Sequence, residues 1–146
     1  MVNKTILRPE GVWDPNNAGF EHPQPFSQGL SAPSGRMVWV AGQVALDGDG
    51  TVHGVGDAGA QAELALQNIA RVLEAGDATL NDVVKLTVYL TDMADLPAVQ
   101  EVRARYFPED PPVSSTIGIS SLVNPELLVE IDAVAIVNVE HTAARE

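Results

Sequence analysis

PPVSSTIGISSLVNPELLVEIDAVAIV, residues Pro111–Val137, is the stretch from which the rest of the chain can be interpreted. It predicts one strand over Ser115–Ser120, a turn, and a long strand over Leu127–Val137. Side chains alternate between the faces of a strand, so Glu130 shares one face with Asp132. A carboxylate in so apolar a strand is either solvated at a cleft between subunits or buried with a partner, because an unpaired buried charge is costly. Glu130 is therefore the first candidate for a functional residue.

The composition predicts a single domain over residues 1–146. A chain of 146 residues, 45% of them hydrophobic, can bury a core large enough to fold without disulfide bonds. The absence of cysteine excludes disulfides and thiolate chemistry. The formal net charge of −12, from 20 acidic and 8 basic residues, argues against a nucleic-acid partner. No signal peptide and no run of about 18 apolar residues is present, so we predict a cytoplasmic protein without a membrane span.

The other elements follow from hydrophobic periodicity and turn residues. They are a short edge strand at Thr5–Leu7, a hairpin tip at Leu30–Arg36, a strand at Met37–Gln43, a helix at Asp57–Glu74, a strand at Val83–Thr91 and a helix at Asp95–Phe107. The order β-β-α-β-α-β-β is typical of an α+β fold with both helices on one face of a mixed sheet. Because the last strand is apolar on both sides, we expect self-association to bury the other face.

Five strings of the sequence follow one another in the order and spacing of a known family. They are QPFSQG (24–29), VWVAGQVALDGDG (38–50), the stretch 60–107, PPVSSTIGI (111–119) and LLVEIDAVAI (127–136). On these strings the chain resembles the Rid (reactive intermediate deaminase) family, also called L-PSP endoribonuclease-like. The likeness covers about residues 24–137 and leaves 1–23 as an irregular N-terminal extension.

The resemblance implies a chorismate-mutase-like protomer and a homotrimer built around a central β-barrel. It also implies a small-ligand pocket at each subunit interface. Members of the family that are deaminases hydrolyse enamines and imines with release of ammonia, and they use neither a metal nor an organic cofactor.

The resemblance also places the family's pocket roles on this chain. Glu130 matches the pocket glutamate that positions or activates water, and Gly42 matches the pocket glycine. Ala41 stands where deaminases usually carry serine, and Phe26 stands where many carry tyrosine. Ser114 stands at the position of the arginine that grips a substrate carboxylate. A serine cannot replace the two parallel charged hydrogen bonds of a guanidinium.

Losing such a charge pair is expected to cost about 2–5 kcal/mol of binding. The usual small imino acids are therefore not expected as substrates. Ser114, Ser115 and Thr116 offer neutral hydroxyls instead, suited to an uncharged or larger ligand. Their other interpretation is as ordinary strand and turn hydroxyls.

No metal or triad site is predicted. His22, His53 and His141 have neither metal-ligand spacing nor the context of a Ser-His-Asp triad. Trp39 is interpreted as a packing residue. Three functions remain open: an enamine or imine hydrolase that uses Glu130, a module that binds a small metabolite without turnover, and an endoribonuclease. The net charge of −12 and the missing histidine pair make the nuclease the weakest of the three.

Overall fold

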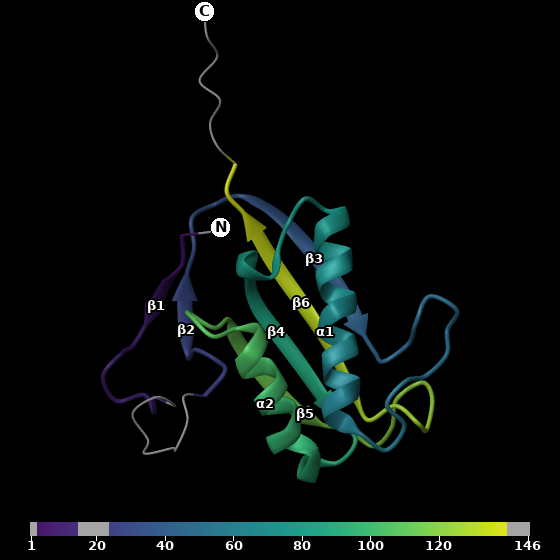
Figure 1. Cartoon of the computed structure of the whole chain (residues 1–146). Coiled ribbons are helices and arrows are strands. Elements are labelled where there is room, and N and C mark those ends of the chain that lie inside the picture. The colour runs from purple at the N-terminus through teal and green to yellow at the C-terminus, as the bar shows by residue number, and fades with distance from the viewer. Residues whose placement is uncertain (1–2, 15–23, 140–146) are drawn as a thin grey trace, which may run out of the picture.

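The computed structural model describes residues 3–14 and 24–139, and its main body is a four-stranded sheet with two helices on one face (Figure 1). The elements of this body are β3 (Arg36–Gln43), α1 (Ala58–Ala75), β4 (Val83–Leu90), α2 (Leu96–Tyr106), β5 (Val113–Gly118) and β6 (Val129–Val137). The strands lie in the order β3-β6-β4-β5, with antiparallel pairs except for parallel β4 and β5. The predicted α+β fold with a mixed sheet is confirmed.

Helix α1 packs over β6 and the edge strand β3 (Figure 1). Asp57 caps its start, because Oδ1 accepts a hydrogen bond from the Ala60 backbone N–H at 3.0 Å. Gly76 ends it by bonding to the last free carbonyls. Its fully buried residues recur at helical spacing and are Gln61, Ala62, Ala65, Leu66, Ile69 and Leu73. In the described part of the chain, neither helix has the length and apolar character to cross a bilayer.

Strand β6 turns one face toward the helices and one away from them. The side chains toward the helices are buried, and they are those of Val129, Ile131, Ala133 and Ala135. The alternate side chains are half-buried, and they are those of Glu130, Asp132, Val134 and Ile136. Each large apolar side chain in the core contributes about 1.5–3 kcal/mol. A slip of one residue would exchange the two faces, so this alternation holds the register of β6.

The N-terminal part forms a separate two-stranded ribbon, which confirms the strand predicted at Thr5–Leu7 and corrects the hairpin tip predicted after it. Strand β1 (Thr5–Leu7) pairs with β2 (Gly29–Ser31) and not with an edge of the main sheet. The hairpin tip predicted over Leu30–Arg36 is therefore wrong in part, because its first residues belong to β2. This pairing joins segments far apart in sequence and leaves no local periodic signal. Lys4 Nζ fixes the ribbon to the body by donating to the Asp110 carbonyl at 2.9 Å.

The other boundaries differ little from the predicted ones. Strand β5 begins two residues earlier than predicted, and β6 begins two residues later. Two short 3-10 turns, η1 (Leu80–Asp82) and η2 (Met93–Asp95), precede β4 and α2. Differences of this size are usual at element ends, where hydrogen bonds fray.

The sheet face opposite the helices is uncovered in the single chain. Met37 is 47% exposed there, Trp39 70% and Ile117 43%. Trp39 therefore does not pack in this core, contrary to expectation. Its neighbour Val40 is buried under the helices, so alternation turns Trp39 outward. Burial of this face by self-association stays a prediction.

Candidate functional site

Glu130 lies on the uncovered face, away from both edges of the sheet. It stands on β6, which runs between β3 and β4, and its cross-strand partner on β4 is Tyr89. Both side chains are half-buried. The Glu130 carboxylate is thus open to water, to a ligand or to a second copy of the chain.

Gly42 brings strand β3 close to the Glu130 carboxylate. The pairing of β3 with β6 shifts its register between Val40 and Gln43. The two residues between them therefore form a β-bulge, which bends an edge strand and re-aims it. A Cβ placed on Gly42 would stand 2.6 Å from the Glu130 carboxyl carbon and 2.7 Å from its Oε1. Only glycine lets the carboxylate lie where it does.

A second carboxylate on this face interacts with a tyrosine. The Tyr89 hydroxyl donates to Asp132 Oδ2 at 3.3 Å. The charge of Asp132 raises the pKa of Tyr89, with further contributions from burial, from this hydrogen bond and from the charge of Glu130. Tyr89 therefore stays a neutral hydrogen-bond donor next to the two carboxylates.

A cavity of about 590 Å³ opens on the same face beside Gly42. Its lining includes Trp39, Ala41, Gly42, Lys85, Asp132 and Val134. Two of the predicted ligand-binding residues, Ala41 and Gly42, thus share one wall. Lys85 adds a cation to a face that otherwise carries carboxylates.

The three predicted hydroxyl residues of β5 are divided between the two faces. Ser114 and Thr116 lie beside buried residues of β4, on the helix side of the sheet. Ser115 lies beside Thr87 on the uncovered face. The Ser114 Oγ is buried and has no hydrogen-bond partner among the described residues. Within one chain, only Ser115 shares the face of Glu130, and β4 lies between their strands.

Phe26 lies in a segment that is fixed to the start of β5. The Ser27 hydroxyl donates to the Pro111 carbonyl at 2.6 Å, and the Ser27 backbone N–H donates to the Pro112 carbonyl at 3.1 Å. The Phe26 ring lies 6.4 Å from that of Trp13, centroid to centroid. The predicted site residues therefore fall into two groups in one chain, one at the β3 bulge and one at the start of β5.

Arg103 is a buried cation that the sequence analysis did not single out. Its side chain is 0% exposed, and burial lowers its pKa to about 10, so it is charged at neutral pH. It donates to the Pro25 carbonyl at 3.2 Å and to the Gln100 amide oxygen at 3.3 Å. Arg103 thus ties α2 to the segment that carries Phe26. The sequence signal for its burial was its position four residues after Val99, which places it on the inner stripe of the helix.

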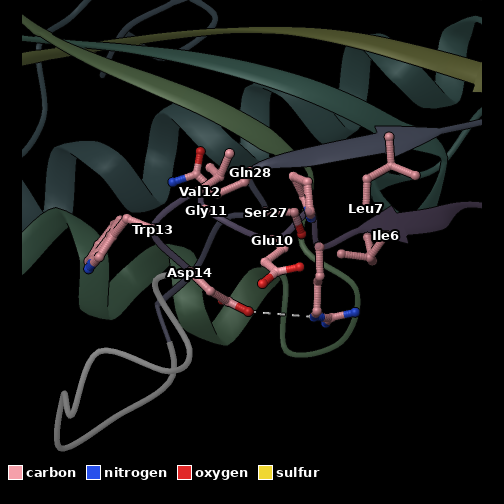
Figure 2. Close-up of a pocket in the computed structure, with 11 residues that line it drawn as sticks. Ile6, Leu7, Glu10, Gly11, Val12, Trp13, Asp14, Ser27 and Gln28 are labelled. Atoms are coloured by element: carbon pink, nitrogen blue, oxygen red, sulfur yellow. Dashed lines mark ion pairs between the residues drawn. The ribbon is translucent and has the colours of Figure 1, made fainter.

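A further cavity of about 300 Å³ lies under the N-terminal segment (Figure 2). Figure 2 shows Trp13 and Leu7 at opposite ends of it. An ion pair between Arg8 Nε and Asp14 Oδ2, 3.8 Å long, stands at its border. None of the predicted site residues lines this cavity, so it is separate from the candidate site.

The histidines take no part in a metal centre in the described part of the chain. Within residues 3–14 and 24–139, no three His, Asp or Glu side chains are grouped as a metal site would require. His53 Nε2 lies 2.7 Å from Asp47 Oδ2 and forms a hydrogen bond with it. His22 and His141 lie outside the described residues.

The sequence and the fold both have known relatives. A sequence model of the family described as Endoribonuclease L-PSP matches residues 18–137. Over 133 residues the chain is 36% identical to the 3-aminoacrylate deaminase RutC of Acinetobacter baylyi. This match covers 90% of this chain and 97% of that protein. It is 38% identical to protein DfrA of Myxococcus xanthus, over 77% of this chain and 85% of that one.

Solved structures show the same likeness. YyfB of Yersinia pestis, a protein of unknown function of the conserved Rid family, matches with a TM-score of 0.79 at 35% identity. The match covers 92% of this chain and 99% of that one.

Proposed function

The chain belongs to the Endoribonuclease L-PSP (Rid) family, and we propose that it hydrolyses an enamine or imine, with release of ammonia, at a site centred on Glu130. The observation that carries this proposal is the packing of the Glu130 carboxylate against Gly42 at the bulge of an open sheet face. A carboxylate held in place and open to water can act as the general base that this hydrolysis needs. The name of the Acinetobacter relative, a 3-aminoacrylate deaminase, supports the reaction class.

The reaction consumes one water and needs one group that moves protons. Glu130 accepts a proton from water as the oxygen bonds to the imine carbon and the C=N electron pair moves to nitrogen. The protonated Glu130 then gives that proton to the nitrogen. The C–N bond breaks as the hydroxyl proton passes through Glu130 to the nitrogen, which leaves a carbonyl compound and ammonia. An enamine first takes a proton on carbon and loses one from nitrogen to become the imine.

The proposal includes a homotrimer whose interfaces complete the site. Strands β3 and β5 are the two edges of the sheet, so one chain cannot bring its two groups of site residues together. In the assembly we propose, β5 of one copy approaches the β3 bulge of the next. The segment with Phe26 and the start of β5, which carries Ser114, Ser115 and Thr116, then lies next to Ala41, Gly42 and Glu130 of the other copy. The exposed side chain of Trp39 gives such an interface an apolar area to bury.

The proposed substrate is uncharged where it meets β5, or larger than a simple imino acid. Ser114 is neutral, and its buried hydroxyl can form hydrogen bonds but no ion pair. A substrate carboxylate placed there would lose its water without gaining a cation, which disfavours it.

Ammonia release tests the proposal most directly. Imines generated enzymatically from a panel of amino acids are offered to the wild type, Glu130→Gln, Glu130→Ala and Ser114→Arg. We expect activity on bulky apolar imines in the wild type, lost with both Glu130 variants. Turnover that survives Glu130→Gln would refute the role of Glu130. If the wild type releases no ammonia and Ser114→Arg does, the fold can support deamination but the natural protein binds its ligand without turnover.

A further inference from the structure

A second cavity, of about 730 Å³, lies between α1 and the hairpin that follows β3. We call it the Arg71 cavity. Residues that line it include Gly42, Leu46, Asp47, His53, Leu64, Asn68, Arg71 and Val72. Its volume is within the usual range for a small-molecule site, and Val44, Leu46, Leu64 and Val72 give it an apolar part. Gly42 is the one residue that it shares with the cavity of about 590 Å³ on the uncovered sheet face.

Arg71 brings to this cavity a charge that no carboxylate of the described residues neutralises. Its guanidinium donates to the Asn68 amide oxygen at 2.7 Å. No carboxylate of the described residues lies within ion-pair distance of it, although the chain has 20 acidic residues. A guanidinium has five N–H groups, so most of them are free to bind a ligand.

The Asn68 amide holds the guanidinium in place. Its Nδ2 donates to the carbonyls of Val44 and Leu46, at 3.2 and 3.0 Å. The amide nitrogen must face these two carbonyls, so the amide oxygen must face Arg71. A cation that is already oriented loses less conformational freedom when it binds an anion.

The acidic group of the cavity is already satisfied by other donors. Asp47 Oδ2 bonds to His53 Nε2 at 2.7 Å, and Oδ1 accepts from the backbone N–H groups of Asp49 and Thr51. The hydrogen bond with His53 is the largest of the effects that lower the pKa of Asp47. Asp47 is therefore held by its own turn and does not compete for Arg71.

We propose that the Arg71 cavity binds a small carboxylic acid with an apolar body. The carboxylate pairs with the Arg71 guanidinium, for which its planar fork geometry is suited. The apolar body lies against Leu64 and Val72 and extends toward Gly42. This site is independent of turnover at Glu130, but its ligand contacts the same bulge on which the Glu130 carboxylate packs.

Binding of benzoate and of neutral benzamide tests this site. Both are titrated by calorimetry into the wild type and into Arg71→Gln, with Arg105→Gln as the matched control. Arg105 is also a helical arginine, but it is paired with Glu63 at 2.8 Å and lies on α2. We expect benzoate to bind the wild type and the control alike. Arg71→Gln should weaken it roughly 10- to 100-fold, and benzamide should bind weakly to all three.

A second variant and a second readout keep the proposal open to refutation. Val72 is 39% exposed, so Val72→Trp should leave the fold intact while it fills the cavity and abolishes binding with Arg71 still present. In nuclear magnetic resonance spectra, benzoate should shift the amide signals of Gly42 and Asn68. Equal binding by wild type and Arg71→Gln, or equal losses in both arginine variants, would overturn the proposal. Failed deamination with intact benzoate binding would overturn only the proposed function.

Discussion

Substituting Gly42 by alanine should damage the proposed site without damaging the fold. The added Cβ would stand 2.6 Å from the Glu130 carboxyl carbon, and ordinary contact begins near 3.4 Å. The carboxylate must therefore retreat by about 0.8 Å, which it can do by rotating its flexible side chain. Misplacing a catalytic group by about 1 Å can cost on the order of 10²-fold in rate. We expect ammonia release to fall by about that factor.

The folding cost of the same change should be small. A strained rotamer at Glu130 costs about 0.5–1.5 kcal/mol, and replacing glycine by alanine in extended backbone returns about 0.4–1 kcal/mol. The melting temperature should therefore move by no more than about 3 °C. Gly48→Ala is the matched control, because nothing lies within 4 Å of its added Cβ. In a Glu130→Gln background, Gly42→Ala should cause no further loss. Full activity of Gly42→Ala, or unfolding of it, would refute the reasoning.

Three further changes test the fold and the assembly. Arg103→Ala should lower the free energy of unfolding by about 2–4 kcal/mol in urea titrations, and Arg103→Met by less than half as much, because methionine refills the volume. Trp39→Asp should reduce the particle mass found by light scattering to that of one 15.5 kDa chain, and an unchanged mass would place the interface elsewhere. Hydrogen bonds from Tyr106 and then Arg105 lower the pKa of Glu63 from its ordinary 4.5, so its stabilisation is complete above that pH and lost as pH falls through the lower folded value. Glu63→Gln should therefore lower the melting temperature at about pH 7, and this loss should shrink as the pH falls below 4.5, so a loss that does not change with pH would contradict the reasoning.

Much of the fold could be predicted from periodic patterns. The helical stripe that includes Leu66 and Ile69 predicted α1, and it is buried except for Val72. The strict alternation around Glu130 predicted which side of β6 faces the helices, because a strand has a period of two. The resemblance supplied Gly42 as a neighbour of Glu130, and the bulge gives the physical reason for a glycine there.

Other features depend on pairing and packing between distant segments. The ribbon of β1 and β2, the burial of Arg103 and the side of the sheet on which Ser114 lies all follow from such contacts. A local pattern cannot show which segments pair, because the apolar content of a short strand is compatible with several partners.

The sequence by itself determined which faces of α1 and β6 are apolar, because that periodicity is a local property of the chain. Only the tertiary structure decided that Glu130 meets Gly42 and that Ser114 lies on the helix side of the sheet. It also decided that Arg71 lines a cavity without an acidic partner in the described chain. These outcomes depend on strand order and on a one-residue register shift, and both arise only when distant strands come together.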